Sequence, residues 1–365
     1  MGDLGEAAGM SEITPNGATV LVTGNQGYIG SVLTEVLAGH GYRVIGLDSG
    51  VFRDVAFVPR KVEAQVQVTK DIRDVEPGDF QGVDAVIHLA ALSNDPLGSL
   101  NPAATHEINH RATLRVAEAA KAAGVRRFLF SSSCSMYGVS TESFVSEGAA
   151  FNPQTPYAEA KVAAERDLRA IADDRFSPVY LRNATVFGIS PRMRLDLVVQ
   201  NLVAYGYLFG TISILSDGTP WRPLVHVRDV AEAFRFFLEL PRQAVHNQAF
   251  NIGHRDNNLQ IRQVASMVQE AVPRTTVEIK NENPSDTRSY RVSFERAYAA
   301  GYRPRYGVPQ GVREIHETFQ RVSFTPEDFQ SDAYITLKRY QRLLAEGRVD
   351  SELRLLPASR EPRER

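Results

Sequence analysis

Apolar and polar positions along the first half of the chain form two alternating patterns. Short apolar runs, most of them closed by glycine or a polar residue, occur at 18–24, 42–48, 64–68, 84–91, 126–133 and 178–186. Runs of this length are expected for strands that are buried on both faces of a parallel sheet. The pattern therefore predicts a largely parallel sheet built from these six segments.

Helical periodicity fills several of the intervals between these runs. An apolar stripe directly after the first run consists of Ile29, Val32, Leu33, Val36 and Leu37. The clearest further helices are predicted over 103–123 and 156–172, the second with Thr155 as N-cap and Pro156 at the first helical position. Strands that alternate with helices predict an α/β fold with a doubly wound parallel sheet, as in the Rossmann fold.

The order of patterns also suggests how the chain is divided. We expect a flexible tail at 1–16, a nucleotide-binding Rossmann domain at 17–190 with contributions from about 224–254, a smaller mixed α/β substrate lobe at 191–325, and a C-terminal part at 326–365. Within that last part, 326–347 is weakly amphipathic and predicts one helix, followed by a charged tail.

Composition narrows the class of protein. The net charge of −2 and the pI near 6.5 give no broad attraction to nucleic acid or to anionic membranes. Cys134 is the single cysteine, which excludes an intramolecular disulfide and fits a reducing compartment. No apolar run reaches the roughly 18 residues of a membrane span, and the first residues lack a signal-peptide layout, so we expect a cytoplasmic protein. The eight histidines show no metal-binding spacing, and His88 and His226 read as core residues.

A glycine-rich turn joins the first strand to the first helix. Gly24, Gly27 and Gly30 stand at three-residue spacing, where a helix N-terminus can receive a pyrophosphate. Asp48 ends the second strand, where a carboxylate can bind an adenosine ribose and would repel a 2′-phosphate, and no arginine follows it before Arg53. These residues predict an NAD site; the alternative is a glycine-rich turn with a capping or surface aspartate.

A tyrosine and a lysine lie four residues apart near the start of the helix at 156–172. Tyr157 and Lys161 then share a helix face, and an ammonium one turn away would lower the pKa of a phenol that acts as a base. Ser133 ends a predicted strand at the expected ligand crevice and could bind a substrate hydroxyl, with Ser131 and Ser132 as rivals. The alternative is a half-buried tyrosine beside a solvated lysine.

Five motifs occur together and in order: TGNQGYIG, DIRD at 71–74, HLAA at 88–91, SSSCSMYG, and the pair Tyr157 and Lys161. In this combination the chain, from about 18 to 322, resembles the extended short-chain dehydrogenases/reductases of the NAD-dependent nucleotide-sugar epimerase/dehydratase family. The resemblance implies a catalytic set of Ser133, Tyr157 and Lys161. It also implies a homodimer, formed through the helices at 103–123 and 156–172 of each subunit.

The resemblance assigns further residues to the two ligands. Expected cofactor contacts, besides the glycines, Asp48, Tyr157 and Lys161, are Gln26, Tyr28, Ile29, Asp71, Ile72, Leu89, Ala90 and Ala91. Expected contacts to a nucleotide-diphosphate sugar are Ser93, Asn109, Ser135, Asn183, Arg222, Asp286 and Arg288.

Departures from the family pattern narrow the reaction. Dehydratases of the family carry an Asp-Glu pair where this chain has Cys134 and Ser135, and decarboxylases usually keep a glutamate in place of Ser135. The 3,5-epimerases place a cysteine two residues before Tyr137, whereas Cys134 stands three before it, so Cys134 reads as a small buried residue. We therefore expect an NAD-dependent epimerase, acting at C4 of the sugar through a keto intermediate. The alternatives are a reductase of a nucleotide-linked keto-sugar, and less readily a dehydratase, a decarboxylase or a non-catalytic NAD sensor.

Overall fold

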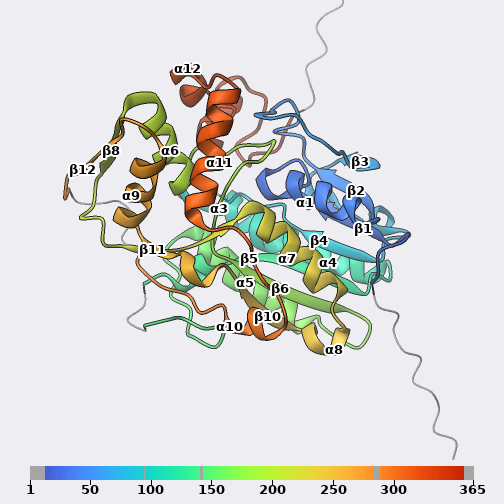
Figure 1. Cartoon of the computed structure of the whole chain (residues 1–365). Helices are drawn as coiled ribbons and strands as arrows, with labels where there is room; N and C mark the ends of the chain where they lie inside the picture. Colours follow the sequence, from blue (N-terminus) through green and yellow to red (C-terminus); the bar gives the residue numbers. More distant parts are fainter. Residues whose placement is uncertain (1–12, 94, 140–142, 283–287, 357–365) are drawn as a thin grey trace, which may run out of the picture.

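A seven-stranded sheet forms the centre of the computed structural model, which describes residues 13–93, 95–139, 143–282 and 288–356 (Figure 1). Its strands are β1 (Thr19–Thr23), β2 (Arg43–Asp48), β3 (Val66–Thr69), β4 (Ala85–His88), β5 (Arg127–Ser133), β6 (Ser177–Asn183) and β10 (Gln248–Ile252). All are paired in parallel, in the order β10-β6-β5-β4-β1-β2-β3. The predicted doubly wound sheet is confirmed. Its order reverses between β1 and β4, where ligands bind in such folds.

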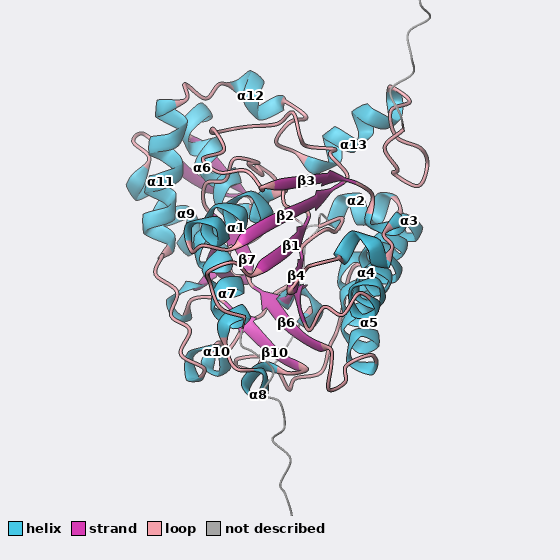
Figure 2. Ribbon diagram, turned by 90° about the vertical axis from the view of Figure 1, so that its right-hand side faces the viewer, coloured by secondary structure: helices cyan, strands magenta, loops and turns pink. Residues whose placement is uncertain are grey.

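Helices cover both faces of this sheet (Figure 2). One face carries α1 (Tyr28–Gly39) and α7 (Val227–Glu239), and the other carries α4 (Ala112–Ala122) and α5 (Pro156–Ala170). Val20 and Val22 of β1 belong to the apolar cluster on the first face, whereas Leu21 between them belongs to the cluster on the second. Because successive side chains of a strand point to opposite faces, β1 is buried on both sides, as its apolar run predicts.

The two predicted helices on the second face are present. Thr155 caps α5 as expected, since its Oγ1 accepts a hydrogen bond of 3.2 Å from the backbone N–H of Ala158. The helical segment expected at 103–123 consists of α3 (Pro102–His106), a π-helical turn at Glu107–Arg111, and α4. The π turn adds a residue within the helix, which the apolar periodicity did not reveal.

The prediction of a single helix over 326–347 is wrong. The structure has two helices there, α12 (Pro326–Gln330) and α13 (Thr336–Ala345). The chain becomes extended at Ser331, with φ −59° and ψ 146°. Asp332 then pairs with Arg339 and Arg342 of α13, at 3.3 and 3.0 Å. These ion pairs hold a polar turn where the sequence pattern favoured a continuous helix.

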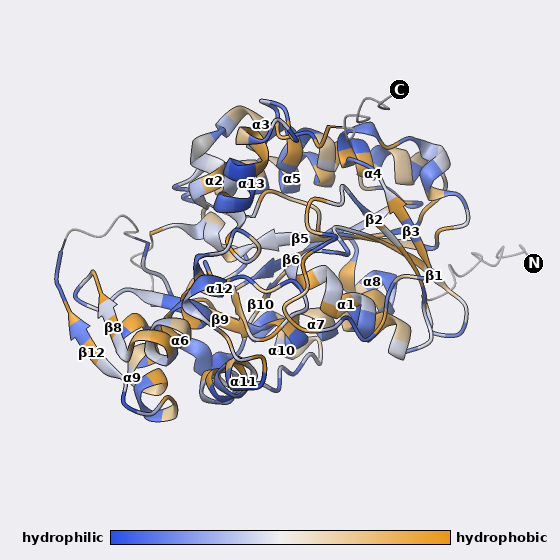
Figure 3. Ribbon diagram, turned by 90° about the horizontal axis from the view of Figure 1, so that it is seen from above, coloured by the Kyte–Doolittle hydropathy of each residue, from blue (hydrophilic) through white to orange (hydrophobic). Residues whose placement is uncertain are grey.

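A smaller mixed α/β region lies beside the sheet, at the left of Figure 1. It contains a three-stranded sheet of β7 (Thr185–Phe187), β9 (Trp221–His226) and β11 (Asn258–Gln260), and a parallel pair of β8 (Thr211–Ile214) and β12 (Thr276–Ile279). Its helices include α6 (Val198–Phe209), α9 (Ile261–Ala271) and α11 (Val308–Arg321). Figure 3 shows the main sheet between two layers of helices. Of the helices in the described part of the chain, none combines the length and the hydropathy that crossing a membrane requires.

Candidate active site

A cavity of about 830 Å³ opens where the order of the main sheet reverses. This volume falls within the roughly 300–1,000 Å³ usual for ligand pockets. Most of the predicted site residues line it, namely Gly24, Gly27, Tyr28, Ile29, Gly30, Asp48, Asp71, Ile72, Leu89, Ala90, Ala91, Ser93, Ser133, Ser135, Tyr157, Lys161, Asn183, Arg222 and Arg288. Residues separated by more than 250 positions in the sequence therefore meet around one space.

The glycine turn is too tight for side chains at two of its three positions. Gly24 has φ +71°, and a Cβ on it would stand 2.8 Å from the backbone nitrogen of Ala90. A Cβ on Gly30 would lie 2.1 Å from the carbonyl oxygen of Gly24. Gly27 is the N-cap of α1 and provides no side-chain cap for the first N–H groups of that helix. The turn thus leaves a helix N-terminus open to the cavity, which suits a pyrophosphate.

Asp48 stands at the end of β2, with both carboxylate oxygens engaged by the backbone. It accepts hydrogen bonds from the N–H groups of Gln26 (3.2 Å) and Gly50 (2.9 Å). Burial raises the pKa of Asp48, and these two hydrogen bonds oppose the rise. Gln26, an expected cofactor contact, is not among the described residues of the cavity wall; its backbone N–H instead orients Asp48.

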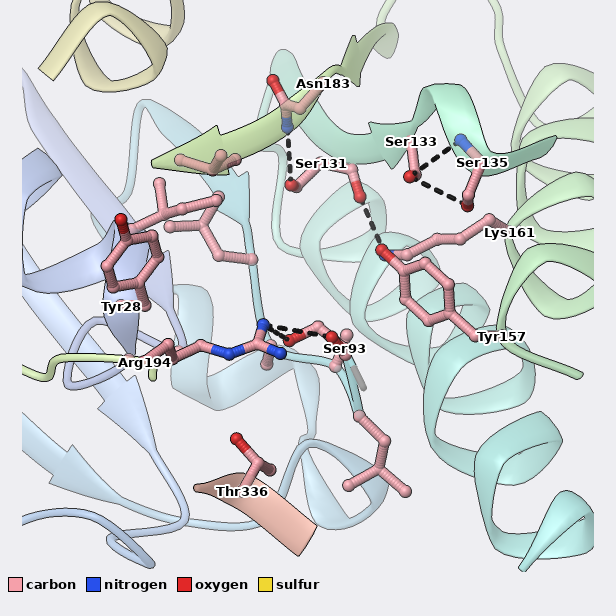
Figure 4. Close-up of a pocket in the computed structure, with 18 of the residues that line it drawn as sticks. Tyr28, Ser93, Ser131, Ser133, Ser135, Tyr157, Lys161, Asn183, Arg194 and Thr336 are labelled. Atoms are coloured by element: carbon pink, nitrogen blue, oxygen red, sulfur yellow. Dashed lines mark hydrogen bonds between the residues drawn. The ribbon is translucent and has the colours of Figure 1, made fainter. Parts of the chain in front are cut away.

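Tyr157 and Lys161 extend from one face of α5 toward Ser131 (Figure 4). The Nζ of Lys161 donates a hydrogen bond of 2.8 Å to the backbone oxygen of Ser131 and lies 4.5 Å from the centroid of the Phe130 ring. Lys161 is only 2% exposed. This burial lowers its pKa to about 7, although the charge of Glu165 acts in the opposite direction.

The three consecutive serines of β5 have different partners. Ser132 is 2% exposed and donates to the sulfur of Met136 at 3.6 Å. Ser131 accepts a hydrogen bond of 3.1 Å from the side-chain amide of Asn183. Ser133 donates to the Oγ of Ser135 at 2.9 Å, and both side chains belong to the cavity wall (Figure 4). Of the three serines, Ser133 is the one whose hydroxyl is bonded to the hydroxyl of another residue of the cavity wall, Ser135.

Two arginines that sequence reasoning missed also line the cavity. Arg194 crosses between Tyr28 and Tyr157 in Figure 4 and donates to the backbone oxygen and the Oγ of Ser93, at 3.1 and 3.2 Å. Asp196 binds its guanidinium through two hydrogen bonds of 3.0 and 2.8 Å. Burial opposes the charge on Arg194, but Asp196 outweighs burial and raises the pKa of the guanidinium.

The second arginine, Arg192, is almost fully buried. Its Cζ lies 3.8 Å from the Phe52 ring centroid, and its Nη2 donates to the Oγ1 of Thr336 at 2.9 Å. The run Arg-x-Arg-x-Asp at 192–196 gave no clear signal in the sequence, because charged residues in a loop are usually exposed.

Five of the seven expected substrate contacts line the cavity, namely Ser93, Ser135, Asn183, Arg222 and Arg288. Arg222 and Arg288 lie together, since the Nη1 of Arg222 donates to the backbone oxygens of Trp221 (2.9 Å) and Arg288. Asp286 lies outside the described residues. Asn109 is fully buried and does not belong to the described cavity wall; its amide exchanges hydrogen bonds of 2.8 and 3.0 Å with the backbone of Leu92. For Asn109, the expected substrate contact is replaced by a structural role, because both ends of its amide are occupied.

The buried histidines and the cysteine have structural environments, as the sequence suggested. His88 is bonded by the hydroxyls of Thr23 and Thr113, at 2.7 and 3.0 Å, and burial lowers its pKa to about 3. His226 is fully buried and bonded to Glu314 at 2.7 Å. Cys134 is 1% exposed, and burial raises the pKa of its thiol. A thiol in that state is a poor nucleophile.

The chain was compared with known protein families and proteins. The sequence profile described as "NAD dependent epimerase/dehydratase family" matches residues 20–253. The chain is 30% identical to a UDP-glucose 4-epimerase of Mycolicibacterium smegmatis over 83% of its own length and 99% of that protein. It is 24% identical to a human dTDP-D-glucose 4,6-dehydratase over 82% of its length and 89% of the relative.

A similar solved structure is that of MoeE5 in complex with UDP-glucose and NAD. It superimposes with a TM-score of 0.72 at 29% identity, and the match covers 83% of this chain and 99% of the other. The fold is thus shared with a protein whose structure holds both NAD and UDP-glucose.

Proposed function

This chain belongs to the NAD-dependent epimerase/dehydratase family, and we propose that it is a nucleotide-sugar epimerase that inverts C4 of its substrate. The cavity fits the family's cofactor, because the open N-terminus of α1, the tight glycine turn and the half-buried carboxylate of Asp48 all line it. These are the features that a dinucleotide requires at its pyrophosphate and its adenosine ribose.

The positions of the acidic residues support an epimerase rather than a dehydratase. Asp48, Asp71 and Asp196 are the acidic residues on the described cavity wall. Asp48 ends β2 and Asp71 follows β3, and Asp196 is engaged by Arg194. Elimination of water needs an acid and a base beside the reacting carbons. The positions after Ser133 instead hold a buried thiol and the hydroxyl of Ser135, which favours simple oxidation and reduction of a carbinol over dehydration.

Three side chains would carry out the proton chemistry. When bound, NAD supplies a nicotinamide that takes a hydride from the C4 carbon and returns it. Tyr157 removes the proton of the C4 hydroxyl, and Ser133 orients that hydroxyl through its Oγ. Lys161, held by the backbone of Ser131, stabilises the phenolate by its charge. The transient 4-keto sugar then turns its other face toward the cofactor, and Tyr157 gives the proton back.

Inversion also requires that the sugar turn while its nucleotide stays in place. Arg222 and Arg288 line the cavity on the side of the smaller α/β region, and a guanidinium can bind phosphate in a bidentate manner. We assign the diphosphate of the substrate to this pair. The sugar would then be fixed at one end only and could rotate about the diphosphate linkage.

A labelled substrate tests the proposal. UDP-glucose carrying deuterium at C4 is incubated with purified protein without added NAD. We expect UDP-galactose that keeps the deuterium at C4, because the hydride leaves and returns within one active site. Absence of interconversion with UDP-, dTDP- and GDP-linked hexoses alike would contradict the proposal.

A reductase of a keto-sugar nucleotide is the second candidate, because the same three residues would serve it. The two differ in the fate of the cofactor, since an epimerase regenerates NAD in each turnover and a reductase must exchange it. Denaturing the purified protein and quantifying released nucleotide separates them. Close to one NAD per chain favours the epimerase, and an empty site with consumption of NADH or NADPH favours the reductase.

We further propose a homodimer through α4 and α5. The two helices lie side by side on the outer surface of the sheet (Figure 2), and α5 presents Val162 and Ala163, both half-buried, toward the outside. Pairing of two such helices from each subunit would bury these apolar positions. Light scattering coupled to gel filtration tests the proposal, with twice the mass of 40.4 kDa expected.

A further inference from the structure

The last described segment of the chain forms one side of the dinucleotide site. This segment, called here the C-terminal cover, consists of α13 and the residues that follow it to Leu356. Thr336, Tyr340 and Leu353 of the cover line the same cavity as Asp48 and Asp71. The family profile ends at residue 253, so the cover lies beyond the part of the chain that identifies the family.

Apolar side chains of the cover pack against the side of the cavity that contains Asp48 and Asp71, where the adenosine is expected. Leu343, Val349 and Leu353 are at most 4% exposed and belong to the same buried cluster as Leu47 and Ile72. The Tyr340 ring meets Phe52 edge to face, with centroids 6.4 Å apart. Tyr340 is 8% exposed, and burial raises its pKa, with the charges of Asp48 and Asp71 adding to that rise. Tyr340 thus shares the cavity wall with the two carboxylates at the ends of β2 and β3.

Hydrogen bonds and ion pairs connect the cover to the edge of the Rossmann domain. The guanidinium of Arg339 donates twice to the backbone oxygen of Val51, at 3.0 and 3.2 Å, and pairs with Asp54 at 2.6 Å. Farther along, Arg73 donates to the backbone oxygen of Glu352 at 2.8 Å, and Arg354 pairs with Asp74 at 2.8 Å.

The cover also touches two other walls of the cavity. Asn101 donates to the backbone oxygen of Ser351 at 2.7 Å, next to α2 (Asp95–Leu100). Thr336 accepts from Arg192, whose loop passes over the cavity. Figure 3 shows α13 beside α2 and α3. The cover therefore bridges the β2 edge, α2 and the arginine loop.

We propose that the C-terminal cover binds the adenosine half of NAD through Tyr340 and Leu353 and must detach before the cofactor can leave. Aromatic and aliphatic side chains at this place suit the flat, apolar adenine ring. The inference rests on the proposed function in one respect: slow release of NAD is what an epimerase, which regenerates its cofactor, can tolerate.

Exchange of cofactor measures this directly, without any sugar. The full-length protein with its bound NAD is mixed with an excess of isotopically labelled NAD, and the label bound to protein is followed with time after rapid gel filtration. The test variant is Arg339→Ala, which breaks three bonds to the Val51–Asp54 loop. Its partners are the backbone oxygen of Val51 and two carboxylates, Asp54 (60% exposed) and Asp332 (22% exposed). Asp332 keeps its ion pair with Arg342 in this variant, so no buried charge is left alone.

Arg342→Ala is the matched control. Arg342 lies on the same helix and is 42% exposed, and its ion pairs, to Asp332 and Glu346, stay within the C-terminal part of the chain. We expect exchange to accelerate about tenfold or more in Arg339→Ala, since bonds to a charged group are lost. In Arg342→Ala we expect the wild-type rate within about twofold.

A second pair of variants keeps the test decisive if Arg339→Ala does not fold. Arg354→Ala breaks the partly exposed pair with Asp74, and Tyr340→Leu removes the ring while keeping an apolar side chain. Faster exchange in either, with an unchanged melting temperature, supports the cover. Equal exchange rates in wild type, Arg339→Ala, Arg354→Ala and Tyr340→Leu overturn it. Because no sugar is present, the result stands even if the protein epimerises none of the substrates offered.

Discussion

Lys161 donates its hydrogen bond to the backbone oxygen of Ser131 at 2.8 Å, so the ammonium group is fixed at the carboxyl end of β5. A carbonyl oxygen stabilises the charged form, but the lysine is 2% exposed, and its ammonium lies 4.5 Å from the centroid of the Phe130 ring. The effect of burial is the larger one, and it lowers the pKa of Lys161 to about 7. The lysine that activates Tyr157 is therefore only partly charged near neutral pH until an anion enters the site.

Binding of NAD should consequently take up protons. Below about pH 6 Lys161 is already charged, so uptake is small; at pH 7 we expect up to about half a proton per NAD, and at pH 8 up to about 0.9, because the anionic cofactor raises a pKa that burial had lowered. Titration calorimetry of cofactor-free protein in buffers of different ionisation enthalpy measures this uptake. Lys161→Met serves as control and should bind NAD without it; equal uptake in that variant would assign the protons to another group.

The glycine turn predicts opposite phenotypes for two alanine variants. A Cβ on Gly30 would meet the Gly24 oxygen at 2.1 Å, whereas a Cβ on Gly27 would stand 3.1 Å from the same atom. We expect Gly30→Ala to lose about 3 kcal/mol of unfolding free energy through overpacking.

Gly27→Ala should lose less than about 1 kcal/mol of stability but bind NAD at least about tenfold more weakly, since its methyl group would occupy the approach of the pyrophosphate. Urea unfolding and NAD titration of both variants separate the two effects. Normal NAD affinity in Gly27→Ala would place the pyrophosphate elsewhere.

Asp48 should determine the choice between NAD and NADP. The Asp48→Asn variant keeps the shape of the side chain and removes its charge. Hydrogen bonds to a charged group contribute about 1.5–3 kcal/mol, so we expect NAD to bind about tenfold to hundredfold more weakly. Discrimination against NADP should fall at the same time.

Fluorescence titrations with NADH and NADPH give both affinities for this variant. Asp84→Asn is the control, because the Asp84 carboxylate precedes β4, at the opposite end of the strands, and accepts a hydrogen bond of 2.8 Å from the backbone N–H of Thr19. An unchanged ratio of the two affinities in Asp48→Asn would show that another group discriminates between NADH and NADPH at the ribose.

Local patterns predicted the parts of the site that lie within one strand, turn or helix. The glycine turn, Asp48 at the end of β2, and Tyr157 with Lys161 on α5 each depend on spacing over fewer than 30 residues, and the structure brings these groups to one cavity. Six of the seven strands of the main sheet were likewise predicted, because a strand buried on both faces has a continuous apolar run, whereas β10 was not among the predicted segments.

Contacts between distant segments were not visible in the sequence. Arg192 reaches Thr336 across 144 positions, and the proximity of Tyr340 to Asp48 depends on how α13 folds back over the sheet. Asn109 was assigned to the substrate on position alone, whereas its amide bonds the backbone of Leu92. Such pairings depend on tertiary packing, which periodicity does not encode.

A buried ion pair one turn beyond Lys161 yields the last prediction, on stability. Arg182 of β6 forms two hydrogen bonds to Glu165 of α5, at 3.0 and 2.7 Å, with both side chains at most 3% exposed. The same guanidinium donates to the Tyr137 hydroxyl at 2.9 Å, and these partners raise the pKa of Arg182. Removal of one member of a buried pair leaves the other charge unpaired, at a cost of about 3–5 kcal/mol.

Glu165→Gln should therefore lower the unfolding free energy by about 3 kcal/mol or more. It should also lower the pKa of Lys161 further, because Glu165 opposes the effect of burial there, so that the alkaline decline of NAD binding shifts to lower pH. Urea unfolding and the pH dependence of NAD affinity measure the two effects. Glu107→Gln is the matched control, since Glu107 pairs with Arg111 at 3.3 Å on the exposed side of the neighbouring helical segment and should contribute less than about 0.5 kcal/mol. A Glu165→Gln variant as stable as this control would mean that the buried pair is compensated by Tyr137 and the backbone of Glu147, which also bind Arg182.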